Sequence, residues 1–175
     1  MGGSIMEHMR IFLSAVLVAA LAASTPHLTV ATSASAATAK PRSKVSLFVD
    51  VIPDPKIHVY APGVKDYIPI ALTLAPPKDV TLGKVQYPKS EDLFFEPLNE
   101  HVPVYQSPFR LVQDATLGPS FKPGQAVTLT GTLKYQACDD KVCFAPASAP
   151  VSWTITVAEA ASGSGKSTGP GKSGA

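Results

Sequence analysis

Beyond its first forty residues, the chain alternates apolar and polar side chains in several separate runs. Apolar residues recur at nearly every second position in the segments 45–51, 68–74, 127–135 and 151–157. In the last of these, Trp153, Ile155 and Val157 alternate with threonines. A period of two places one face of a strand in a core and the other in water. The pattern therefore predicts four β-strands, with Trp153 in the core of the last one.

Turn-forming residues separate these runs and leave little room for helices. Dipeptides such as Pro76-Pro77, Gly118-Pro119 and Pro123-Gly124 lie between the runs, and the chain holds 17 prolines. Proline interrupts helical hydrogen bonding, and clusters of proline and glycine mark turns. Short strands separated by such turns are typical of all-β proteins. We predict an all-β fold, an immunoglobulin-like antiparallel β-sandwich.

The N-terminal segment has the pattern of a secretory signal peptide. Arg10 precedes an apolar run over residues 11–23, and Ala34-Ser35-Ala36 gives an A-x-A cleavage pattern before Ala37. The run holds 13 residues, whereas a membrane-spanning helix needs about 20. We expect a signal peptide over 1–36, a linker over 37–43 and the domain over 44–159, in a periplasmic or other extracytoplasmic location with no stable membrane insertion after cleavage. A retained, membrane-tethered N-terminus is the alternative.

The C-terminal segment 160–175 is rich in Gly, Ser and Lys, a composition that predicts a disordered tail. Its Gly-Ser-Gly-Lys-Ser-Thr string is not a phosphate-binding loop, because the full motif needs glycine where the chain has Ala160 and a helix must follow it. Between residues 37 and 160 the 12 Lys and Arg balance the 12 Asp and Glu. Nucleic-acid binding requires a clustered basic excess, so we expect no nucleic-acid partner.

The segment 87–110 lacks clean alternation and mixes acidic with aromatic residues, among them Phe94, Phe95 and Tyr105. A long loop of this composition is either a functional lid or a loop packed on itself. The sequence does not decide between the two.

The only two cysteines, Cys138 and Cys143, are separated by four residues and follow a predicted strand. A tight turn at Asp139-Asp140 brings them within disulfide range, and an even cysteine pair in an exported chain favours a disulfide. So small a loop stabilises by only about 2 kcal/mol, against about 3 kcal/mol for a fifteen-residue loop. This makes it a weak structural crosslink, yet structural hairpin disulfides are common. The spacing alone leaves a structural and a redox role open.

The remaining chemistry is sparse. The acidic neighbours Asp139 and Asp140 raise the pKa expected for the Cys138 thiol, which favours a pair that is attacked as a disulfide by a partner. Downstream of the expected cleavage, His58 and His101 could complete a zinc site with the cysteines, but the paired ligand spacing of such sites is missing. No hydrolytic arrangement is present. We expect no metal and no cofactor.

Three motifs resemble a known family. They are the cysteine hairpin Tyr135-Gln136-Ala137-Cys138 to Cys143-Phe144-Ala145-Pro146, the segment His58-Val59-Tyr60-Ala61-Pro62-Gly63, and the acidic-aromatic middle segment. Together they are similar to the N-terminal domain of the bacterial thiol:disulfide interchange protein DsbD, over residues 45–157. The hairpin is the specific part of the resemblance, because the strand pattern is generic.

The resemblance implies an immunoglobulin-like domain in which Cys138 and Cys143 cycle between disulfide and dithiol. They would pass reducing equivalents between thioredoxin-like proteins, and the electrons could come from a separate membrane electron transporter. In that family an acidic-aromatic loop caps the cysteines. By position the cap candidates are Asp92, Phe94 and Phe95, and the residues expected to flank the site are His58 and Tyr60. The alternative function is a non-catalytic immunoglobulin-like binding module with a structural disulfide.

Overall fold

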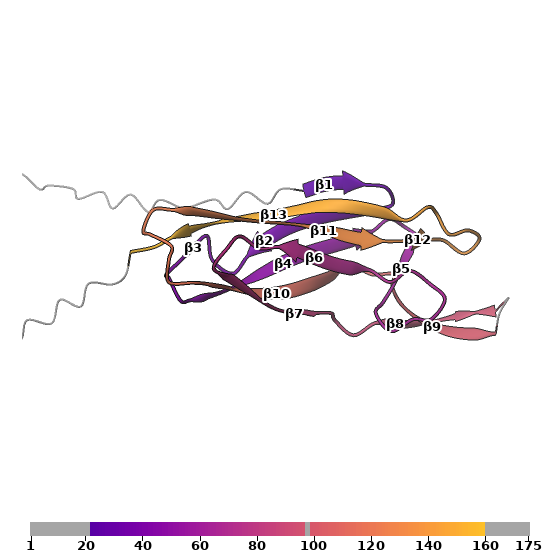
Figure 1. The fold of residues 1–175 in the computed structure, drawn as a ribbon. Coiled ribbons are helices and arrows are strands. Elements are labelled where there is room, and N and C mark those ends of the chain that lie inside the picture. The colour runs from indigo at the N-terminus through magenta and orange to yellow at the C-terminus, as the bar shows by residue number, and fades with distance from the viewer. Residues whose placement is uncertain (1–21, 97–98, 160–175) are drawn as a thin grey trace, which may run out of the picture.

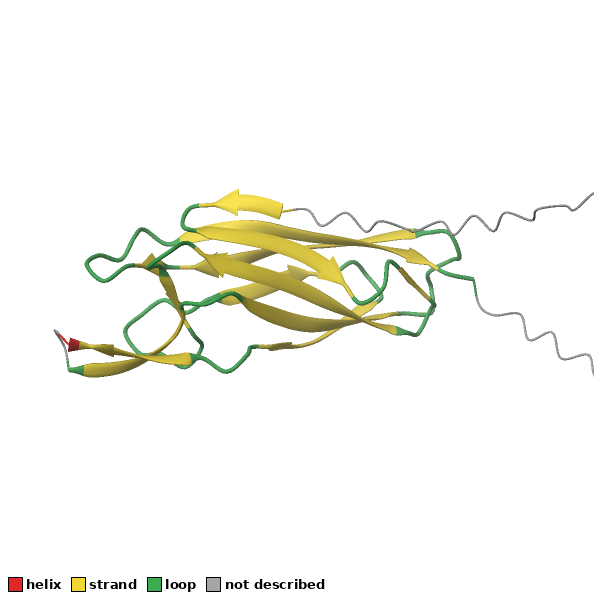
Figure 2. Ribbon diagram, turned by 180° about the vertical axis from the view of Figure 1, so that it is seen from behind, coloured by secondary structure: helices red, strands yellow, loops and turns green. Residues whose placement is uncertain are grey.

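The chain folds into two large β-sheets that pack face to face, and a third, smaller sheet lies at one end (Figure 1). The structure is a computed structural model and describes residues 22–96 and 99–159. All thirteen named elements of this part are strands (Figure 2). The predicted all-β, immunoglobulin-like sandwich is therefore confirmed. Within the described residues there is no helix of the length and apolar character needed to cross a membrane.

The first large sheet has the strand order β1-β2-β4-β10-β7 and is antiparallel throughout. Its strands are β1 (Ala22–Thr25), β2 (Leu28–Ala34), β4 (Lys44–Pro53), β10 (Phe109–Leu117) and β7 (Val80–Gln86). The long central strand β4 alternates between buried and less buried positions over its whole length. Its inward residues form one half of the core.

The second large sheet has the order β3-β13-β11-β6. Its strands are β3 (Thr38–Ala39), β13 (Ala147–Val157), β11 (Ala126–Tyr135) and β6 (Ala71–Ala75). Strands β11 and β13 pair in register over ten residues, and only β3 runs parallel to its neighbour. Trp153 is buried in this sheet, and its indole N–H donates to the carbonyl oxygen of Ser33 on the opposite sheet at 2.8 Å. The predicted core position of Trp153 is confirmed.

The small sheet has the order β12-β5-β9-β8 and lies beyond one end of the sandwich (Figure 1). Its strands are β12 (Ala137–Cys138), β5 (His58–Tyr60), β9 (Glu100–Tyr105) and β8 (Glu91–Phe95). Strand β12 follows directly on β11, and β5 follows β4 after a short turn. Each large sheet thus contains a strand that continues along the chain into a strand of the small sheet.

Three of the four predicted strands are present with nearly the expected bounds, within β4, β11 and β13. The fourth, expected over 68–74, begins only at Ala71. Pro69 lies in the missing part and has no N–H to donate to a strand neighbour. Ile68 is 43% exposed, whereas Ile70 is buried. The apolar alternation therefore starts before the strand does.

Strands of the sandwich precede the predicted domain start at residue 44. Residues 28–34, expected within the signal peptide, form β2 and pair with β4 over seven positions, and Leu28 and Val30 are buried. The expected linker 37–43 contributes β3 to the second sheet. The small residues at 31–36 resemble a signal-peptide cleavage region, and β2 was therefore not predicted from the sequence. A cut before Ala37 would remove β2, although the cleavage position itself stays a prediction. The expected signal residues 1–21 and the expected tail 160–175 lie outside the described residues.

The segment 87–110 is not the long loop that its irregular pattern predicted. It contains β8 and β9, which form an antiparallel hairpin, and the start of β10. The prediction failed because β8 has no fully buried position, so its sequence shows no sharp apolar alternation.

Candidate functional site

Cys138 and Cys143 form a disulfide across a tight turn at the small-sheet end of the molecule, with Cα atoms 4.0 Å apart. The Asp139 N–H donates to the carbonyl oxygen of Val142 at 3.0 Å. The Asp139 carboxylate in turn accepts the N–H groups of Val142 at 2.7 Å and Lys141 at 2.8 Å. These two backbone hydrogen bonds lower the pKa of Asp139 below its ordinary value. The turn therefore holds an ionised carboxylate beside the disulfide.

The two sulfur-bearing residues differ sharply in exposure. Cys138 is 1% exposed and packs in a small apolar cluster with Tyr60, Val102 and Val104. Cys143, on the return arm of the hairpin, is an exposed residue. Cys143 is therefore accessible to solvent, whereas Cys138 is enclosed by protein.

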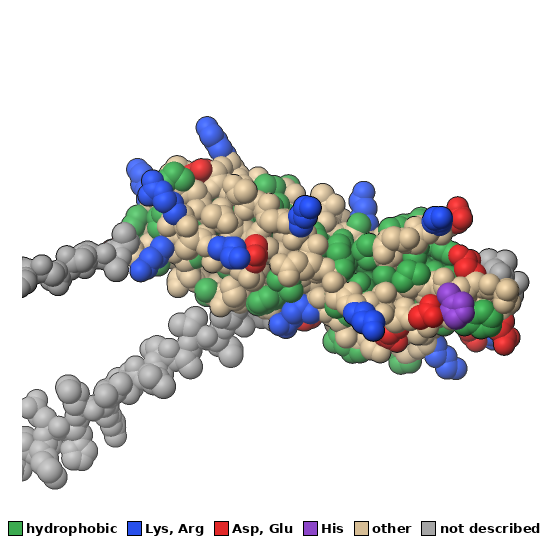
Figure 3. Space-filling model, turned by 90° about the horizontal axis from the view of Figure 1, so that it is seen from below, with side chains coloured by type: hydrophobic (Ala, Val, Ile, Leu, Met, Phe, Trp, Pro, Cys, Tyr) green, Lys and Arg blue, Asp and Glu red, His purple; other side chains and the backbone are tan. Residues whose placement is uncertain are grey.

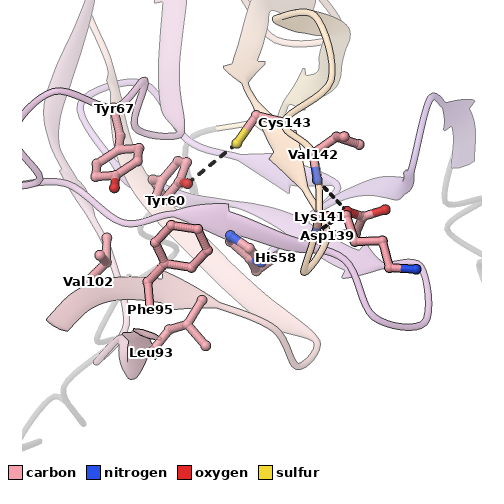
Figure 4. Close-up of a pocket in the computed structure, with 10 residues that line it drawn as sticks. All are labelled: His58, Tyr60, Tyr67, Leu93, Phe95, Val102, Asp139, Lys141, Val142 and Cys143. Atoms are coloured by element: carbon pink, nitrogen blue, oxygen red, sulfur yellow. Dashed lines mark hydrogen bonds between the residues drawn. The ribbon is translucent and has the colours of Figure 1, made fainter. Parts of the chain in front are cut away.

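Strand register places His58, Cys138 and Cys143 in one row across the small sheet. Cys138 lies directly opposite His58 of β5 on one side and directly opposite Cys143 on the other. Directly opposed residues project to the same face of a sheet. Tyr60, two residues after His58, projects to this face as well, and its hydroxyl lies 3.5 Å from the Cys143 sulfur (Figure 4).

The hydroxyl of Tyr60 remains protonated at neutral pH. Burial, followed by the nearby Tyr67 and Glu100, raises the pKa of Tyr60 to about 12. The Tyr60 ring stacks on that of Tyr67 with centroids 4.3 Å apart, and the Tyr67 hydroxyl donates to the Glu100 carboxylate at 3.2 Å. Tyr60 is thus a fixed hydrogen-bond donor directed at the Cys143 sulfur.

The imidazole of His58 is only 7% exposed. Burial lowers the pKa of His58 below 6.5, and the negative charge of Asp139 only partly opposes this shift. The ring meets that of Tyr60 edge-on, with centroids 5.4 Å apart. His58 is therefore a neutral imidazole at neutral pH, held beside the cysteine pair.

A hollow of about 160 Å³ lies between the cysteine turn and the β8–β9 hairpin (Figure 4). It is lined by two groups of side chains. His58, Tyr60, Asp139, Lys141, Val142 and Cys143 come from β5 and the cysteine turn, and Tyr67, Leu93, Phe95 and Val102 come from the facing side. Cys143 thus opens onto a mostly apolar space of the size of a few water molecules.

The β8–β9 hairpin presents different residues on its two faces. Leu93 and Phe95 line the hollow. Asp92 and Phe94 alternate with them and lie on the outer face, where both contact His101. The Asp92 carboxylate is 2.7 Å from the His101 imidazole, and Phe94 is 46% exposed. Charged side chains gather at this end of the molecule next to apolar surface (Figure 3).

The structure brings only some of the predicted site residues together. His58, Tyr60 and Phe95 line the hollow with Cys143, whereas Asp92 and Phe94 do not. His101, considered with His58 for a zinc site, lies on the outer face of the hairpin. Among residues 22–96 and 99–159, no three or more His, Cys, Asp and Glu side chains are arranged to hold a metal ion.

Sequence reasoning missed Leu93, Tyr67, Val102 and Val142 as lining residues. Leu93 carried a usable signal, because it is two positions from Phe95 and a strand would place both on one face. Val102 carried none, since it reaches the hollow only through the pairing of β9 with β8. Tyr67 carried none either, because it lies in the connection between β5 and β6 and reaches the hollow by stacking on Tyr60.

A brace behind the cysteine hairpin was also missed. His27, in the β1–β2 turn, stacks on Phe144 with ring centroids 3.9 Å apart. The Tyr135 hydroxyl donates to the carbonyl oxygen of Pro26 at 2.8 Å, and Gln136 donates to the carbonyl oxygen of Phe144 at 3.0 Å. The N-terminal strands thus position the arm that follows Cys143. The expected cleavage before Ala37 had excluded His27 from consideration.

Comparison with protein families gives one match, the family described as "Thiol:disulfide interchange protein DsbD, N-terminal", over residues 25–153. The match covers more than half of the chain and includes both cysteines. The chain belongs to this family. The matched region of the DsbD N-terminal family begins close to β2, as the folded domain does. A search of curated proteins finds no match.

A solved structure has the same fold. The N-terminal periplasmic domain of ScsB from Proteus mirabilis matches with a TM-score of 0.54 and 14% identity, covering 78% of this chain and 50% of that one. The chain thus spans about half the length of the ScsB structure. The GAE domain of yeast GGA1 has a TM-score of 0.41 and 19% identity, covering 74% of this chain and 94% of that one.

Proposed function

We propose that this domain carries out thiol–disulfide exchange outside the cytoplasm, passing reducing equivalents between thioredoxin-like proteins through Cys138 and Cys143. The observation that carries the proposal is the unequal exposure of the two cysteines, one buried and one open to a partner. Membership of the DsbD N-terminal family supports the same chemistry. The likeness to a periplasmic domain of ScsB supports the location.

In the proposed reaction, a partner thiolate attacks the Cys143 sulfur. A bond forms between the partner sulfur and Cys143, the Cys138–Cys143 bond breaks, and the electron pair leaves on the Cys138 sulfur. The second thiolate of the same partner then attacks the partner sulfur that is bonded to Cys143. The partner leaves as an oxidised disulfide, and Cys138 and Cys143 are left reduced. The dithiol transfers two electrons to the disulfide of the downstream thioredoxin-like protein by the reverse sequence.

The β8–β9 hairpin is proposed to shield the pair from other oxidants. Phe95 and Leu93 face the hollow in front of Cys143 and are the shielding side chains in this proposal. Asp92 and Phe94 lie on the outer face of the same hairpin, where they contact His101, and they take no part in the shielding in this proposal. A partner that displaces the hairpin would then gain access to the sulfur.

Mixed-disulfide trapping tests the exchange function. A Cys138→Ser variant keeps the exposed Cys143, so it should form a stable mixed disulfide with a thioredoxin-like protein whose second active-site cysteine is replaced by serine. The matched Cys143→Ser variant keeps only the buried Cys138 and should form little. Non-reducing electrophoresis with mass spectrometry identifies the adduct.

The reduction potential of the Cys138–Cys143 pair provides the second measurement. An exchange site should lie above the roughly −300 mV that marks structural disulfides. A lower potential, together with no adduct from the Cys138→Ser variant, would instead indicate a structural disulfide in a binding module.

A further inference from the structure

The buried cysteine has a titratable neighbour that the exchange reaction described above does not use. His58 lies directly opposite Cys138 in the β5–β12 pairing, on the same face of the small sheet. Both residues are buried, at 7% and 1% exposure. His58 also lines the hollow onto which Cys143 opens (Figure 4). A proton held on the imidazole therefore has a route to water, whereas Cys138 itself has little contact with solvent.

The reduced form of the pair creates a need for such a group. A buried thiol disfavours its charged thiolate, and the nearby Asp139 carboxylate disfavours it further. Only the thiolate is an effective nucleophile. Cys138 must nevertheless lose its proton whenever it attacks a mixed disulfide on Cys143. Exposed Cys143 can exchange protons with water directly, so the need is specific to Cys138.

We propose that His58 is the general base for Cys138, an inference that rests on the proposed exchange function. Once Cys143 is joined to a partner, the Cys138 thiol gives its proton to the imidazole and its sulfur attacks the Cys143 sulfur. The Cys138–Cys143 bond forms, the bond from Cys143 to the partner breaks, and the electron pair leaves on the partner sulfur. The imidazolium then releases its proton to water in the hollow. In the reverse direction the imidazole takes up a proton from water in the hollow and gives it to the departing Cys138 sulfur.

The charges around His58 suit this role. From the cysteine turn, Asp139 contributes a negative charge and Lys141 a positive one. Tyr60, from the same strand, is uncharged because its pKa is about 12. From the facing hairpin, Leu93 and Phe95 are apolar. Burial keeps His58 neutral and ready to accept a proton, and Asp139 stabilises the imidazolium once it forms.

The reaction of the reduced protein with Ellman's reagent tests the proposal without a protein partner. Attack by exposed Cys143 releases one coloured thionitrobenzoate, and attack by Cys138 on the resulting mixed disulfide releases a second. Stopped-flow absorbance separates the two phases. General-base catalysis contributes on the order of 10²-fold or more. We therefore expect His58→Gln to slow the second phase at least about tenfold at pH 7 while leaving the first nearly unchanged.

The pH profile distinguishes a base from a structural residue. In the parent protein the second phase should level off above the His58 pKa, which lies below 6.5. In His58→Gln it should keep rising with pH as the thiol ionises. His58→Tyr, which keeps an aromatic ring, repeats the test should the glutamine variant fail to fold, as judged by circular dichroism. His101→Gln, on the outer face of the β8–β9 hairpin, is the matched control and should leave both phases unchanged.

Equal second-phase rates in the parent and in a folded His58 variant would overturn the proposal, as would loss of the plateau by His101→Gln. A uniform slowing with the plateau retained would assign His58 a structural role only. The proposed exchange function fails on a different result, the absence of a mixed disulfide with thioredoxin-like proteins. The two failures are therefore distinguishable.

Discussion

The large sandwich and the small end sheet bury their side chains in different ways. In β4 of the sandwich, buried and less buried positions alternate over ten residues. In β5 of the small sheet all three residues are buried, and in the cap strand β8 none is fully buried. A strand with one face on a core has a two-residue alternation of apolar and polar side chains in its sequence. A short strand that is covered on both faces, or exposed on both, lacks this alternation. The cysteine pair and the hollow beside it lie on strands of the second kind.

Removing β2 should break the sandwich and gives the largest expected effect. A chain starting at Ala37 loses the buried side chains of Leu28 and Val30, each worth about 1.5–3 kcal/mol. It also loses seven residue pairs with β4 and the hydrogen bond from Trp153 to Ser33. Domains have only about 5–15 kcal/mol of net stability. We therefore expect that a chain of residues 37–159 shows no cooperative thermal unfolding when it is monitored by circular dichroism.

The matched control for that deletion is a chain covering residues 25–159, which keeps β2 and the brace of His27 on Phe144. It should unfold cooperatively. A shorter chain that unfolds at the same temperature would show that β2 is dispensable and would restore the domain start at residue 44.

Changing the two faces of the cap sharpens the comparison within the small sheet. Phe95→Ala removes a side chain that lines the hollow, so the reduced thiols should react severalfold faster with iodoacetamide. Phe94→Ala removes an aromatic of equal size from the outer face and should change the rate little. Stability should fall much less in either variant than in the β2 deletion. Equal rates in the two variants would mean that the inward face of the hairpin does not shield the pair.

The smallest expected effect concerns the charge in the cysteine turn. Hydrogen bonds from the N–H groups of Val142 and Lys141 lower the pKa of Asp139 below 3.8. A lowered folded-state pKa gives stability that is present above the unfolded value and is lost as the pH falls through the folded one. An NMR titration of the Asp139 carboxyl should therefore show a midpoint below 3.8.

The free energy of unfolding should also be measured for the parent and for Asp139→Asn over the same pH range. The difference between the two should shrink as the pH falls through that midpoint. The effect is small because the carboxylate is open to water, which screens its interactions. A midpoint at or above 3.8 would mean that the turn does not hold the carboxylate in the ionised form.

Much of the sandwich could be predicted because its long strands each carry a full apolar period, as in β11 and β13. Strands β10 and β2 were among those not predicted. The inward positions of β10 include Gln113 and Ala115, which weaken its apolar alternation. In β2 only Leu28 and Val30 are fully buried, and the following small residues are half-buried. An alternation of two residues is too short to identify a strand beside an apolar leader.

The candidate site was predictable only in part. The hairpin of Cys138 and Cys143 followed from the spacing, since a turn of so few residues leaves little conformational choice. The cap candidates lie in the segment that forms the β8–β9 hairpin, but the sequence did not show which face of the strand each side chain takes. The register of β8 against β9 places Phe95 toward the cysteines and Phe94 away from them. A shift of one residue would exchange the two faces of the strand.

The sequence by itself determined an all-β chain with one cysteine hairpin and a family resemblance, because strand periodicity and short turns are local properties. Only the tertiary structure decided that Cys138 is buried while Cys143 is exposed, and that His58 and Tyr60 share their face of the sheet. These features depend on pairings between β5, β9 and β12, which are far apart in the chain. Burial and cross-strand contact result from such non-local pairing, and no local pattern encodes them.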